Sequence, residues 1–142
     1  MANFVKFHCF LEDLGLQKHN LNTDEIRVFL TNDTPVPATH LSKGAGGGTE
    51  LDGITEEHGY APADVQNTYS QVAGVGSLEG VDIIWTATGG SFGYFQYAVL
   101  YNHTSAGKEL IGYWEYPLAA PIICLIGEKF TVDLEPTIFT LI

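Results

Sequence analysis

The stretch GGSFGYFQYAVLYN, residues 89–102, decides which fold we expect. It is rich in aromatic and aliphatic residues, which favour strands, and it opens on two glycines typical of a hairpin turn. Its aromatic side chains alternate imperfectly: Phe95, Tyr97 and Tyr101 fall on one face, and Phe92 and Tyr94 on the other. Apolar residues on both faces predict a strand covered on both sides. The covers we consider are an opposing sheet and a neighbouring subunit, with a purely internal core as the alternative.

The chain on either side of this stretch consists of short apolar runs separated by turn residues. Toward the N-terminus, residues 25–31 alternate with a period of two, which predicts a half-buried strand. Further strands are expected over 65–72, 81–87, 92–102, 110–116, 122–126, 129–134 and 137–142. Short strands at a spacing of roughly 8–12 residues predict a mainly β fold, an antiparallel β-sandwich or jelly roll.

The first 20 residues carry a different period. Apolar residues recur there at helical spacing: Phe4, Phe7, Leu11 and Leu14. This stripe predicts one N-terminal α-helix, with Asn3 as its N-cap and Gly15 near its end. We therefore expect a single domain over residues 1–142, with a helix or arm at 1–20, a β-sandwich at 24–142 and a glycine-rich loop at about 39–63.

The charge of the chain excludes some classes of partner. Six Lys and Arg residues stand against 17 Asp and Glu, for a net charge of −11. Such a surface repels phosphate, so we expect neither nucleic acid nor anionic membrane as a partner. The cations form no basic run, since they are spread along the sequence as Lys6, Lys18, Arg27, Lys43, Lys108 and Lys129. We find neither a signal peptide nor an apolar run of the roughly 18 residues that a membrane helix needs.

No residue pattern predicts catalysis, a cofactor or a metal, so we expect no enzyme. The acidic group Asp52, Glu56, Glu57 and His58 lacks metal-ligand spacing and is interpreted as a solvated loop. Cys9 and Cys124 have no motif spacing and are expected to be buried thiols. Asn102-His103-Thr104 matches a glycosylation sequon, but we interpret it as a turn.

Several segments together resemble a family. They are MANFxKF at residues 1–7, ITE at 54–56, GY at 59–60, GGSFGxFxYAVLYN at 89–102, LIGYW at 110–114 and GExFTVD at 127–133. In this order they resemble a group of small proteins encoded among the virion genes of tailed bacteriophages. The resemblance covers most of the chain, and residues 89–102 are its most specific part. The segment around 43–50 departs from the pattern.

The resemblance implies a structural virion protein, a capsid decoration or cement protein on the outer capsid surface. The implied partners are the major capsid protein and further copies of the chain, as a dimer or trimer. Expected contact residues are Phe4, Phe7, Leu11, Leu14, Tyr113, Trp114 and Tyr116. Two alternatives remain open: a tail- or fibre-associated virion protein, and a carbohydrate-binding module that uses the aromatic strands.

Overall fold

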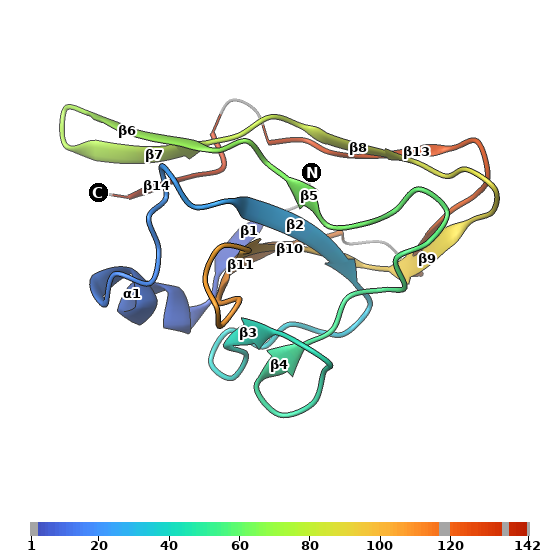
Figure 1. Ribbon diagram of the computed structural model, residues 1–142, viewed down its shortest axis with the longest axis horizontal. Helices are drawn as coiled ribbons and strands as arrows, with labels where there is room; N and C mark the ends of the chain where they lie inside the picture. The colour runs from blue at the N-terminus through green and yellow to red at the C-terminus, as the bar shows by residue number, and fades with distance from the viewer. Residues whose placement is uncertain (1–2, 117–119, 135–136, 142) are drawn as a thin grey trace.

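The computed structural model describes residues 3–116, 120–134 and 137–141. The chain is mainly β with one short helix, as the sequence predicts, and its elements form three layers (Figure 1). The middle layer is an antiparallel five-stranded sheet, here called the central sheet. In spatial order its strands are β1 (Phe4–Lys6), β11 (Leu110–Glu115), β10 (Tyr97–Asn102), β2 (Ile26–Thr31) and β5 (Ala63–Asp64).

Three small antiparallel sheets lie above the central sheet in Figure 1 or beside its right-hand end. They are β14 (Phe139–Leu141) with β7 (Val75–Glu79) and β6 (Thr68–Val72), then β13 (Lys129–Val132) with β8 (Ile83–Thr86), and β12 (Ile122–Cys124) with β9 (Phe92–Phe95). The lower layer contains α1 (His8–Gly15) and a short parallel pair, β3 (Ser42–Lys43) and β4 (Glu50–Leu51). The upper strands and the central sheet form a sandwich-like arrangement; jelly-roll connectivity stays a prediction.

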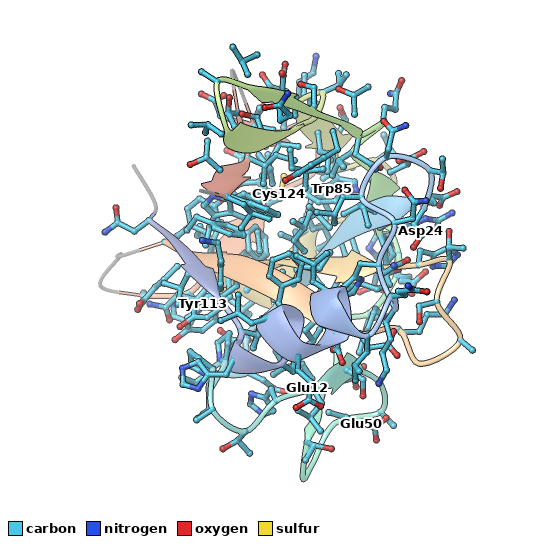
Figure 2. All side chains as sticks on the ribbon, turned by 90° about the vertical axis from the view of Figure 1, so that its left-hand side faces the viewer. Glu12, Asp24, Glu50, Trp85, Tyr113 and Cys124 are labelled. Atoms are coloured by element: carbon cyan, nitrogen blue, oxygen red, sulfur yellow. The ribbon has the colours of Figure 1, made fainter. Side chains whose placement is uncertain are left out.

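The central sheet has a hydrophobic core on each face. The larger core lies between it and the upper strands, and the smaller core lies between it and the segments of the lower layer. Figure 2 shows Trp85 and Cys124 on the upper side and Tyr113 on the side of α1. Strand β10 is buried along its whole length, so the prediction of two covered faces is confirmed. The second cover comes from this chain's own α1 and β4, so no neighbouring subunit is needed for it.

A β-bulge shifts the register of β11 against β10 by one residue. Leu100 pairs with Gly112, but Tyr101 pairs with Leu110, which leaves Ile111 as the extra residue. Leu110 packs in the smaller core and Ile111 in the larger one. Beyond the bulge, Tyr113 continues on the side of the smaller core.

The prediction of a helix beginning near Asn3 is wrong. Residues Phe4–Lys6 form the edge strand β1, paired with β11, and the helix starts only after its N-cap, Phe7. Phe4 belongs to the sheet because it packs on Trp114, with ring centroids 4.9 Å apart. The expected stripe is consequently divided: Phe7 is fully buried, whereas Leu11 is 65% exposed. The expected end at Gly15 is confirmed.

Other expected elements are present with changed bounds. Of the strand predicted over 65–72, only the part from Thr68 onward is a strand, β6, and the short strand β5 ends before it at Asp64. The strand predicted over 92–102 is β9 followed by β10. Strand β7 is missing from the expected strands, because the glycines on both sides of its first residue, Val75, are typical of a turn. The real turn is Ala73-Gly74, where both residues have positive φ, as a two-residue hairpin requires. The loop expected at 39–63 contains β3 and β4.

The two cysteines are free, and Cys124 is buried whereas Cys9 is half-buried. The Cys9 thiol lies 3.6–3.8 Å from the carbonyl oxygens of His40, Leu41 and Leu110. Burial raises the pKa of Cys9 to about 11 and also raises the pKa of Cys124.

Because the thiolate is the reactive form, we expect both cysteines to react far more slowly with a disulfide reagent at mildly alkaline pH than after unfolding in urea. Native reaction as fast as that of the unfolded chain would contradict this.

Candidate functional site

The seven residues expected at subunit contacts do not form one surface. Phe4, Leu14, Trp114 and Tyr116 pack in or against the larger core, and Phe7 and Tyr113 in or against the smaller one. Trp114 is only 8% exposed. Of this set, Leu11 is the residue that projects into solvent. The aromatic strands are thus used internally, which also leaves the carbohydrate-binding alternative without its expected platform.

Exposed apolar side chains are spread over the described part of the chain, and two groups among them lie on different elements. Leu11 of α1 and its C-cap Leu16 are 65% and 60% exposed, and Figure 2 shows Glu12 on the outer side of the same helix. We call Leu11 and Leu16 the helix surface. Tyr94 of β9 and Leu125 and Ile126, which follow β12, are 56%, 52% and 65% exposed. We call these three residues the turn surface.

Leu125 and Ile126 of the turn surface are positioned by a tight turn that joins β12 to β13, two strands that do not pair with each other. The amide of Glu128 donates to the carbonyl of Leu125 at 2.8 Å, and Gly127 has a φ of 86° that suits glycine. The amide of Gly127 also donates to Ala87, which ties the turn to the end of β8. Leu125 and Ile126 therefore project from an anchored backbone. The sequence predicts a strand over 122–126, which is confirmed for Ile122–Cys124, whereas the position of Leu125 and Ile126 on a turn was missed.

A buried polar cluster fixes the loop that follows α1. Asn102, which is fully buried, donates from Nδ2 to Asp24 Oδ2 at 2.8 Å and lies 3.0 Å from His19 Nδ1. Its Oδ1 accepts the amides of Thr104 and Ser105. The expected turn at Asn102 is therefore only partly correct, because this residue ends strand β10 and joins it to the loop.

His19 makes the stability of this cluster depend on pH. Since Nδ1 accepts from Asn102, the ring proton of neutral His19 lies on Nε2, which is buried without a partner. Burial lowers the pKa of His19, and nearby Asp13 and Glu109 only partly oppose this.

We expect acid to destabilise the fold through His19. A lowered folded-state pKa means that the unfolded chain binds the proton more readily, so this contribution is present above the ordinary pKa of 6.5 and is lost as the pH falls below it. Urea unfolding between pH about 7.5 and about 5.5 should show the decrease, and His19→Gln should reduce it. An unchanged pH slope in His19→Gln would contradict the assignment. Some slope should remain, because burial and nearby cations also lower the pKa of His103.

A cavity of about 490 Å³ lies beside this cluster, lined by the loop after α1 together with Tyr69 and Leu141. Its lining is mixed, with Leu14 and Leu21 beside Gln17 and Asn22. No group of three or more His, Cys, Asp or Glu side chains in the described part of the chain is arranged to hold a metal ion. Of the acidic group considered above, His58 contacts the Ser91 carbonyl at 2.7 Å through Nδ1.

No helix within residues 3–116, 120–134 and 137–141 has the length and apolar character to cross a lipid bilayer. Comparison with protein-family models, with curated proteins and with solved structures gave no match to this chain.

Proposed function

We propose that this chain is a structural virion protein, a decoration or cement protein that binds the outer shell of a phage head and bridges neighbouring capsid subunits. The observation that carries the proposal is the pair of exposed apolar surfaces, the helix surface and the turn surface. They belong to α1 and to β9 with the turn after β12, and α1 and β9 lie toward opposite sides of the view in Figure 1. One body with two separate contact surfaces can touch two neighbours at once. The family resemblance of residues 89–102 supports the same function.

Both surfaces suit protein partners. Tyr, Leu and Ile side chains that are half-exposed lose apolar area from water when a partner covers them, at about 25 cal/mol per Å². Each surface is small, so a single contact is weak. Repetition on a symmetric shell strengthens weak contacts through avidity, and an oligomer of this chain would add to it. The net charge of −11 limits binding to packaged nucleic acid.

The test is sedimentation of the purified protein with phage shells that lack it, followed by a measurement of shell stability against heat. We expect wild type to bind and to raise the temperature at which shells rupture. Leu125→Ser with Ile126→Ser, and separately Leu11→Ser with Leu16→Ser, should weaken both effects. Val72→Ser is the matched control, since Val72 is 75% exposed but lies on neither surface.

The outcomes separate the alternatives. Electron microscopy of virions carrying a labelled chain should place it on the outer shell. Label on the tail would favour the tail- or fibre-associated alternative and overturn the cement proposal. Equal shell binding by wild type, both double variants and the control would show that neither surface contributes to shell binding.

A further inference from the structure

Three of the six Lys and Arg residues, although distant in sequence, line one small cavity. Arg27 of β2 lies directly opposite Tyr101 of β10 in the sheet register. Lys43 comes from β3, and Lys108 precedes β11. The cavity has a volume of about 220 Å³ and is completed by His103 and by Ala61 and Pro62. A chain with 17 acidic residues thus concentrates half of its permanent cations at one point.

Two of these cations have no carboxylate partner. Arg27 is paired with Glu25 through Nε. The ammonium group of Lys43 lies over the rings of Phe29 and Tyr101, 5.2 Å and 5.8 Å from their centroids. Lys108 donates to the backbone carbonyl of His103. Within the described residues no carboxylate oxygen lies within 4.0 Å of the Lys43 or Lys108 ammonium, so two positive charges remain unmatched.

The neutral groups of the cavity can hydrogen-bond. The hydroxyl of Tyr101 lies 3.2 Å from His103 Nδ1. Burial lowers the pKa of His103, and the charges of Arg27 and Lys108 lower it further, which favours a neutral imidazole at pH 7. Glu56 also borders the cavity, but its side chain is exposed and therefore screened by water.

We propose that this cavity binds a phosphate group, either inorganic phosphate or the phosphate of a small phosphorylated molecule. A phosphate carries close to two negative charges at neutral pH, which matches the two unmatched lysines. Arg27 contacts Glu25 through Nε and also hydrogen-bonds Tyr101 in the same cavity, and guanidinium groups suit phosphate geometry. The site is local, so it is compatible with a molecule whose overall charge repels long anionic polymers.

Calorimetric titration with inorganic phosphate, at fixed ionic strength maintained with chloride, tests the proposal. We expect saturable binding with one site per chain. Lys43→Gln and Lys108→Gln should each weaken it by about tenfold, the effect of losing one charge-assisted hydrogen bond. Lys129→Gln is the matched control, because Lys129 is exposed at the start of β13, outside the cavity, and its replacement changes the net charge equally but should leave the affinity unchanged. Glu56→Gln should tighten binding.

Further measurements identify the ligand and test the location of the site. Glycerol phosphate that binds more tightly than inorganic phosphate would indicate a phosphorylated molecule, and equal affinity would indicate free phosphate. Phosphate should also raise the pKa of His103, observed through its imidazole NMR signals, because the bound anion stabilises the imidazolium. Acetate binding as well as phosphate would overturn the phosphate assignment. Absence of saturable binding, or equal weakening by Lys129→Gln, would overturn the site; thermal unfolding checks that each variant is folded.

Discussion

Phe95→Ala is expected to lower the free energy of unfolding by about 3–5 kcal/mol. Phe95 is fully buried at the end of β9, and its ring meets the ring of Phe130 edge-on with centroids 4.7 Å apart. It also stacks with Phe92 at 6.2 Å. Truncation would leave a cavity between the upper strands and the central sheet, where close packing limits collapse. Urea unfolding at neutral pH, followed by tryptophan fluorescence, measures the loss.

The adjacent residue provides the matched control. Tyr94 is 56% exposed, so Tyr94→Ala should change the free energy of unfolding by no more than about 0.5 kcal/mol. The two variants remove aromatic rings from neighbouring positions and differ mainly in burial. Equal losses from both would show that the sides of β9 are assigned wrongly.

This pair also shows where alternation along the sequence failed. Counting alternate residues from 92 to 102 placed Phe95 with Tyr97 and apart from Phe92. In the structure Phe92 and Phe95 share the larger core, whereas Tyr97 lies in the smaller one. The count fails because the chain changes sheets at Gln96: β9 pairs with β12, and β10 pairs with β2 and β11. Similarly, Gly89-Gly90 is not a hairpin turn, because β8 and β9 do not pair with each other.

The local pattern predicted a half-buried strand over residues 25–31. Ile26, Val28 and Leu30 all enter the larger core, so the strand is confirmed. The prediction of a single buried face is wrong, because Phe29 on the opposite face is fully buried in the smaller core. The N-terminal pattern misled because apolar spacing cannot distinguish a helical stripe from a strand that leads into a helix. Phe4 is held by Trp114, which is 110 residues away along the chain (114 − 4 = 110) and outside any local window. Tertiary contact decided the element there.

The candidate sites also could not be predicted from the sequence, because they depend on tertiary contacts between distant segments. Arg27, Lys43 and Lys108 looked dispersed because no sequence window contains them, and they meet only when β2, β3 and β11 are assembled. Leu125 and Ile126 of the turn surface belong to an apolar run that also supplies the buried Cys124. Composition alone gives no reason to separate Leu125 from Cys124. Their exposure depends on where β12 ends.

Asn102→Ala is expected to be similarly severe, with a loss of about 3–4 kcal/mol. One amide here serves four groups: Oδ1 accepts from Thr104 and Ser105 at 3.0 and 3.1 Å, and the two Nδ2 hydrogens serve Asp24 and His19. Alanine removes all four bonds and leaves buried polar groups without partners. The partly exposed loop amides can hydrogen-bond to water instead, which keeps the loss in the free energy of unfolding below the sum of four bonds. Urea unfolding at neutral pH gives the value.

Asn102→Asp separates the accepting half of this residue from the donating half. Its carboxylate can still accept the amides of Thr104 and Ser105, but it donates nothing and places a buried negative charge 2.8 Å from the Asp24 oxygen position. Burial and Asp24 should raise the pKa of the introduced carboxyl, so the folded state gains a proton before the unfolded state does. The stability deficit of Asn102→Asp relative to wild type should therefore shrink as the pH falls toward about 5, whereas the deficit of Asn102→Ala should not shrink. If both deficits follow the same pH course, the contact between Asn102 and Asp24 contributes nothing specific, and the residue acts only by filling space.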